Sequence, residues 1–196
     1  MKQTERILGV LIVILMTCRL FFTYPYSALL LTLLMLVLSM LYFIFSFGLL
    51  NRIRFRNLLK KESYVGLSTL RIIGTTLTGF VLSSVVLYSL FKFQNWPYGN
   101  EALRIALLTL LIILFIVVIK FAISKNSFYS FFLVRLCIMG VIASSLYLIP
   151  YENILEMKYR NFPEFIDAEK KLMKDPTNKE LERIADQERL KMDLSK

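Results

Sequence analysis

Long apolar runs alternate with short polar segments over the first 150 residues. Each run has about 18 or more residues, which at 1.5 Å per residue lets a helix cross a bilayer core of roughly 30 Å. The five runs cover residues 7–24, 28–50, 68–91, 102–123 and 128–150. This pattern predicts an all-α integral membrane protein with five transmembrane helices, followed by a charged tail.

The composition excludes several function classes. Of the 196 residues, 57% are hydrophobic and only 19% are charged, which is not the balance of a soluble domain. Histidine is absent, so no imidazole can act as a general base, a zinc ligand or a haem ligand. Cys18 and Cys137 are too few for an iron–sulfur cluster, and they lie near opposite ends of their helices, which disfavours a disulfide. We expect a non-enzyme with no metal, no cofactor and no catalytic residue.

The charge distribution predicts the orientation in the membrane. Residues 1–150 hold fourteen basic and three acidic residues, and the basic ones lie mostly at the ends of apolar runs, where they meet lipid headgroups. This placement favours the lipid bilayer as a partner and argues against nucleic acid. The loop at residues 51–67 carries five basic residues, so it is expected to face the cytoplasm together with the N-terminus. With five spans, the tail emerges on the opposite side.

Two of the predicted turns are alike. At an offset of 72 residues, Phe, Pro and Tyr of the segment 21–27 coincide with those of the segment 93–99. Proline ends a helix and presets a turn, and aromatic residues anchor it at the membrane interface. The pattern predicts a duplicated helical hairpin, although any tight membrane hairpin can converge on these residue types. The predicted units are residues 1–66, 67–126, 127–150 and 151–196: two hairpins, a fifth helix and the tail.

The second turn resembles a known family. Residues 91–103 read Phe-Lys-Phe-Gln-Asn-Trp-Pro-Tyr-Gly-Asn-Glu-Ala-Leu. They are similar to the turn between the two transmembrane helices of GldL, also called PorL, the inner-membrane subunit of the gliding-motility and type 9 secretion motor. The resemblance covers about residues 79–115. It implies a bacterial inner-membrane location with this turn on the periplasmic side, in agreement with the orientation from the loop charges, which also places the tail there.

The same resemblance has two departures. Asn95 stands where the family has histidine, and Leu110 stands where it has the acidic residue that couples ion flow to rotation. No Asp or Glu lies inside any of the five apolar runs. A proton-driven motor needs such a carboxylate in the bilayer. The motor activity itself is therefore not expected here.

Two arginines lie several residues inside their predicted spans, Arg71 in the third and Arg135 in the fifth. Such residues snorkel to the interface, pair with another group, or contact a second subunit or a lipid phosphate. Arg71, Thr75, Gly79 and Ser83 recur every four residues and share one helix face, on which small residues let another helix approach closely. That helix belongs either to this chain or to a second subunit.

The tail changes abruptly to charged sequence. Phe162, Phe165 and Ile166 recur at helical spacing around Pro163, and Asp175-Pro176 can open a second helix. The tail therefore reads as a soluble helical hairpin. One such hairpin cannot bury its own apolar face, so it needs a partner or the membrane surface.

These features favour a non-catalytic subunit or assembly factor of an inner-membrane complex, linked by the resemblance to gliding motility or type 9 secretion. Its partners would be other membrane subunits and a periplasmic protein. Aromatic and turn residues often dominate interfaces, although the same residues form lipid-anchoring belts. The candidate docking residues are Tyr24, Tyr26, Trp96, Pro97, Tyr98, Gly99, Glu101, Phe162, Phe165 and Ile166. The alternatives are a small transporter or channel that uses the arginine-bearing helices, and a lipid-modifying enzyme.

Overall fold

The computed structural model describes residues 2–22, 26–51, 53–58 and 60–194, and this part of the chain contains helices and no strand. Five helices are long, three are short and form the tail, and two 3-10 turns lie between α2 and α3. The helices are α1 (Lys2–Phe21), α2 (Ser27–Leu50), α3 (Thr69–Gln94), α4 (Gly99–Ser124), α5 (Ser127–Leu148), α6 (Tyr151–Tyr159), α7 (Pro163–Lys174) and α8 (Lys179–Leu194). The 3-10 turns are η1 (Phe55–Asn57) and η2 (Lys61–Tyr64).

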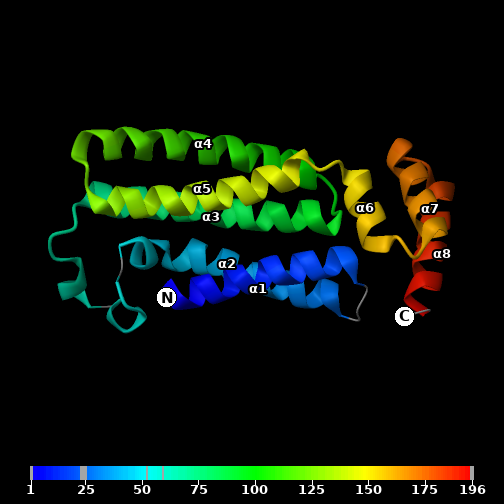
Figure 1. The fold of residues 1–196 in the computed structure, drawn as a ribbon, viewed down its shortest axis with the longest axis horizontal. Coiled ribbons are helices and arrows are strands. Elements are labelled where there is room, and N and C mark those ends of the chain that lie inside the picture. Colours follow the sequence, from blue (N-terminus) through cyan, green and yellow to red (C-terminus); the bar gives the residue numbers. More distant parts are fainter. Residues whose placement is uncertain (1, 23–25, 52, 59, 195–196) are drawn as a thin grey trace.

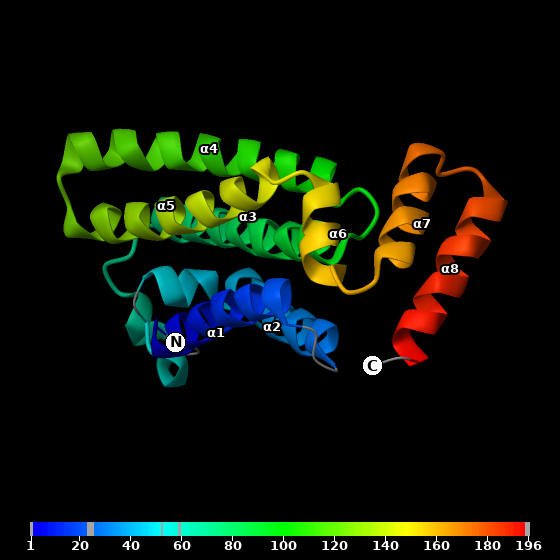
Figure 2. The ribbon, with the colours of Figure 1, turned by 45° about the vertical axis from the view of Figure 1, so that its right-hand side comes forward.

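The five long helices run side by side as an elongated bundle (Figure 1). One end holds the end of α1, the start of α2 and the α3–α4 connection at residues 95–98, together with α6–α8; we call it the turn end. The opposite end holds the described part of the basic segment between α2 and α3, residues 51, 53–58 and 60–68, and the α4–α5 connection at residues 125–126; we call it the loop end. Figure 2 shows the tail set against the turn end. The predicted turns and the tail therefore share one end of the molecule.

Four of the described helices, α2 to α5, are long and apolar enough to cross a membrane. The sequence pattern predicted five such helices. The difference is α1, which is 20 residues long but carries Glu5, Arg6 and Arg19. These charged residues lower the average apolarity of α1 below that of its neighbours. Ionised side chains at membrane depth are also costly.

The small-residue face of α3 packs against α2 of the same chain. Ser83 Oγ lies 2.8 Å from Ser39 Oγ, and Asn51 Nδ2 donates to Thr75 Oγ1 at 3.1 Å. A Cβ atom placed on Gly79 would lie 1.8 Å from Ser46 Cβ, so only glycine allows the backbones to approach this closely. The sequence left open whether the helix that packs on this face belongs to this chain or to a second subunit. In the structure it is α2 of the same chain.

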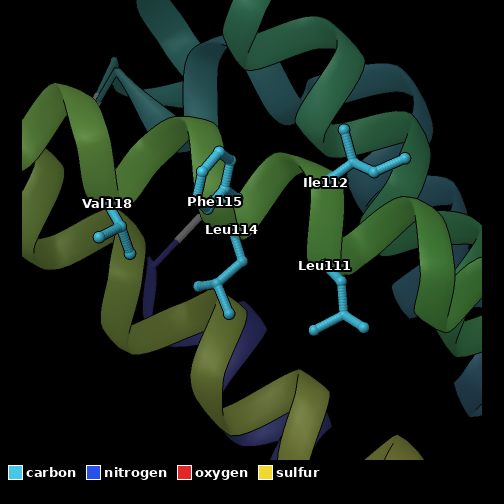
Figure 3. A pocket seen from close by; sticks show the side chains of 5 residues that line it. All are labelled: Leu111, Ile112, Leu114, Phe115 and Val118. Carbon is cyan, nitrogen blue, oxygen red and sulfur yellow. The ribbon is translucent and has the colours of Figure 1, made fainter.

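The outer face of α4 is apolar and faces away from the other helices. Its side chains surround a hollow of about 530 Å³ with no polar residue in its lining (Figure 3). The labelled residues are Leu111, Ile112, Leu114, Phe115 and Val118. Isoleucine and phenylalanine exposed along a helix are expected where lipid is the solvent.

The two hairpins share an unusual backbone feature. Tyr26 and Tyr98 precede α2 and α4 with φ of 58° and ψ of 8° and 7°, a left-handed conformation that is uncommon for a tyrosine. Each carbonyl accepts the first helical hydrogen bond at 2.9 Å, from Leu30 and Ala102 respectively. These positions differ by the same 72 residues as the sequence repeat, which supports a duplicated hairpin.

Replacing Gly79 with alanine tests the α2–α3 contact. Because the added Cβ collides with Ser46 and the Tyr42 carbonyl, we expect Gly79→Ala to destabilise the protein by about 1–3 kcal/mol. Thermal unfolding of the purified chain in mild detergent measures the loss. The matched control is Gly74→Ala on the same helix, where nothing lies within 4 Å of an added Cβ. Equal melting temperatures for the two variants would contradict the packing.

Candidate functional site

A buried ion pair joins the first and last long helices of the bundle. Arg135 on α5 forms a salt bridge with Glu5 on α1, and both side chains are only 10% exposed. Tyr42 on α2 donates its hydroxyl to the other oxygen of Glu5 at 2.7 Å. The Arg135 guanidinium also lies over the Phe131 ring at 4.4 Å. Arg135 therefore pairs within the chain, and its partner is a carboxylate that lies just outside the first apolar run.

Arg71 is held by uncharged groups. Its Nε donates to Asn51 Oδ1 at 2.8 Å, and its guanidinium carbon lies 3.7 Å from the centroid of the Phe128 ring. These contacts link α3 to α2 and α5. Arg71 is therefore a structural link between three helices, held in part by a cation–π contact.

The family-like motif builds the α3–α4 turn. Lys92 is buried and donates to Asn100 Oδ1 at 2.8 Å across the turn, and the Phe91 and Trp96 rings meet edge to face at 5.0 Å. A Cβ on Gly99 would lie 2.8 Å from Lys92 N, so glycine is required where α4 starts against α3. Most of the motif therefore has a structural explanation in this chain.

Leu110 and Asn95, the two residues that depart from the family pattern, lie in different environments. Leu110 is buried in the core and faces Gly140 of α5, whose added Cβ would lie 3.3 Å from it. Asn95 ends α3 in a left-handed conformation (φ 63°), and its side-chain polar atoms are buried without a hydrogen-bond partner among the described residues. An apolar side chain thus occupies the position at which the family carries its acidic residue.

The short helix α6 caps the ends of α1 and α3. A helix leaves its last carbonyls unpaired and slightly negative, so it favours donors and cations there. Lys158 Nζ donates to the Phe93 carbonyl at 2.7 Å, and the Tyr151 hydroxyl donates to the Asn95 carbonyl. Arg160 Nη2 donates to the Phe21 carbonyl at 2.6 Å. These three bonds attach the tail to the bundle.

A second polar node lies beside this cap. Arg19 Nη1 on α1 donates to Gln94 Oε1 on α3 at 2.5 Å. The amide nitrogen of Gln94 donates to the Ala28 carbonyl and to Thr32 Oγ1 on α2, both at 3.1 Å. One glutamine side chain therefore joins α1, α2 and α3 at the turn end.

The tail has a small core of its own. Phe165 and Ile166 are buried with Leu155 of α6 and Met192 of α8, and the Tyr159 and Phe165 rings meet at 5.0 Å. The expectation that the α7–α8 hairpin needs an outside partner for this face is corrected, because α6 covers it. The expected helix start at Asp175-Pro176 is also corrected: α8 begins at Lys179, since Asn178 Oδ1 accepts from the Glu180 and Leu181 amides.

Of the remaining predicted docking residues, Tyr26, Trp96, Pro97, Tyr98 and Glu101 lie at the surface of the turn end, whereas Gly99 is buried and is not available for docking. Tyr26 and Tyr98 are 82% and 85% exposed, and Trp96 is 40% exposed. Pro97 is also exposed, and Glu101 forms a 2.8 Å surface ion pair with Arg104. Phe162 is half-buried beside the tail core. Tyr24 lies outside the described residues.

Several residues that hold the helices together were not singled out from the sequence. Glu5, Tyr42, Gln94, Tyr151 and Lys158 carry the polar contacts that join separate helices. One signal was available: Arg135 has no acidic residue on its own helix, so a carboxylate on another helix was one of the groups that could offset its charge. Within the described residues, no group of three or more His, Cys, Asp or Glu side chains is placed to hold a metal ion, and Cys18 and Cys137 are both free thiols.

Comparison with known proteins returns no family model, no curated protein and no solved structure that matches this chain.

Lys158 makes docking of the tail sensitive to pH. Burial lowers the pKa of its ammonium well below the ordinary 10.5, and the nearby Arg19 lowers it further. Between the lowered pKa and 10.5 the docked state binds fewer protons than the undocked state. The stability of docking should therefore rise with pH through this window.

Hydrogen exchange in α6–α8, corrected for the intrinsic pH dependence of exchange, measures this effect. Protection should increase as the pH is raised from neutral toward 10. The Lys158→Met variant has no titrating group at this position and should show a flatter profile. An unchanged slope in Lys158→Met would assign the effect to another group.

Proposed function

We propose that this chain is a non-catalytic subunit or assembly factor of a bacterial inner-membrane complex, and that it binds its partners through the turn end. The observation that carries the proposal is the way α6 joins the tail to the bundle. Its bonds to the Phe93, Asn95 and Phe21 carbonyls hold the tail beside the exposed Tyr26, Trp96 and Tyr98. Large aromatic side chains with few torsions to freeze are typical interface anchors.

The buried polar groups support a scaffolding role. Arg71 is held by Asn51 and Phe128, and Arg135 pairs with Glu5. Each contact joins two or more helices, as expected of groups that hold a bundle together. A transporter or channel that conducts anions past these arginines would need them to face an open path, so we rank it second. Anion flux in liposomes that disappears in Arg71→Ala and Arg135→Ala variants would favour it.

We further propose that α1 is a fifth membrane helix, with the N-terminus in the cytoplasm and the turn end in the periplasm. The charges of α1 have partners that reduce the cost of insertion: Glu5 pairs with Arg135, and Arg19 bonds to Gln94. The basic segment at the loop end supports the same orientation. The link to gliding motility or type 9 secretion rests on the resemblance of residues 79–115 to GldL.

Fusion of a reporter enzyme after Lys196 tests this orientation. A reporter that is active only in the periplasm should be active there, because five crossings carry the tail to the far side. The matched control places the same reporter in the basic segment after Glu62, where it should be inactive. An inactive reporter on a stable fusion at Lys196 would place the tail in the cytoplasm and remove the proposed periplasmic surface.

Replacement of the two exposed tyrosines tests the docking surface. Tyr26→Asn combined with Tyr98→Asn removes both rings, and asparagine tolerates the left-handed backbone at these positions. We expect at least a tenfold loss of co-purifying partner, because aromatic anchors contribute about 2 kcal/mol or more each. Quantitative mass spectrometry after purification in mild detergent measures the recovery.

The matched control is Phe115→Ala, which removes an exposed ring from the outer face of α4. This control should keep the partner and the normal yield. If the tyrosine variant lowers membrane insertion but the inserted fraction keeps its partner, the rings are lipid anchors and the docking surface is wrong.

A further inference from the structure

A groove of about 540 Å³ lies between α1 and α5 and is floored by α2. Its polar residues are Glu5, Arg6, Tyr42 and Arg135, and all lie at the end nearer the loop end. The other lining residues are apolar: Phe131 and Val134 come just before Arg135 on α5, and the rest run from Gly9 to Ile14 on α1 and from Ile138 to Ile142 on α5, with Leu38 on α2. All the polar lining residues therefore lie at one end of the groove, and the rest of the lining is apolar, which matches the polar head and apolar chain of a lipid.

The polar end has an excess of positive charge. Arg6 and Arg135 contribute two cations, and Glu5 contributes one anion that is already bonded to Arg135 and Tyr42. Arg6 is exposed at this end. Nη1 of Arg135 is buried and has no hydrogen-bond partner among the described residues. An unmet guanidinium donor beside an exposed arginine fits a phosphate, since guanidinium groups bind phosphate through paired hydrogen bonds.

We infer that this groove binds one anionic phospholipid, with its phosphate at Arg6 and Arg135 and one acyl chain along Val13, Ile14, Leu38 and Ile142. The apolar lining of α1 from Gly9 to Ile14 rises about 7.5 Å along the helix, which accommodates the first part of an acyl chain. Basic pockets between membrane helices on the cytoplasmic side suit anionic headgroups. The inference does not need the proposed subunit role, but it rests on the proposed membrane placement of α1 with the loop end on the cytoplasmic side.

Lipid retention by the purified full-length chain tests the headgroup. Native mass spectrometry compares phosphatidylglycerol with phosphatidylethanolamine of the same acyl chains. We expect the anionic lipid to be retained in excess and Arg6→Gln to weaken its retention about fivefold, the effect of one cation near the headgroup. The control Lys120→Gln removes an equal charge from exposed α4 and should retain the lipid.

A second pair of variants tests the acyl-chain part. Gly9 lines the groove, and nothing lies within 4 Å of an added Cβ, so Gly9→Leu fills the space without disturbing the helix contacts. It should abolish retention, whereas Gly74→Leu, at an equally open position on α3, should not. Melting temperatures of all four variants show that they remain folded.

Each other result overturns the inference. Equal retention of the two lipids means that the groove does not select an anionic headgroup. Displacement of phosphatidylglycerol by millimolar inorganic phosphate means that the arginines bind phosphate without the acyl chain. A photoreactive residue at Val13 should form a lipid adduct in native membranes, and an adduct with a protein would assign the groove to a partner helix. Retention that survives Gly9→Leu places the lipid elsewhere.

Discussion

The constraint that organises this protein is the lack of hydrogen-bonding solvent around its apolar helices. Lipid offers no partner to a buried polar group, so such groups are stabilised by each other. Asn51 meets Arg71 and Thr75, Ser39 meets Ser83, and Glu5 meets Arg135. Each of these contacts joins two helices at one relative height. The polar pairs thus set the register of a bundle whose apolar contacts alone would tolerate sliding.

The same constraint explains how the tail is attached. The last carbonyls of α1 and α3 have no partner within their own helices. Tyr151, Lys158 and Arg160 supply donors to them, and burial raises the pKa of the Tyr151 hydroxyl, which keeps it a donor. The cost is a buried lysine whose charge is poorly solvated. Because the tail is bonded to two helix ends, its position is tied to the ends of α1 and α3.

The two hairpin turns have the same backbone conformation at Tyr26 and Tyr98 but make different contacts. Tyr26 and Tyr98 repeat the same backbone conformation, but Ser27 in the first copy corresponds to Gly99 in the second. Glycine lets α4 start in contact with the backbone of α3, which brings Asn100 to Lys92. The first copy instead leaves α1 beside α2, and a groove remains between α1 and α5. The two hairpins therefore differ in the contacts that their turns and helices make with the rest of the bundle.

The sequence by itself determined the number of long helices and, for α2 to α5, their limits to within three residues, because apolar runs and proline or glycine turns act locally; α1 begins at Lys2, five residues before the expected run. The expected run at residues 28–50, for example, matches α2 within one residue. The tertiary structure decided which charges are paired: Glu5 and Arg135 are 130 residues apart, and no local pattern connects them. It also decided that Phe165 and Ile166 are buried, because α6 is too short and too mixed in polarity to show a clear period. Helix formation follows from neighbours in the chain, whereas burial and pairing follow from neighbours in space.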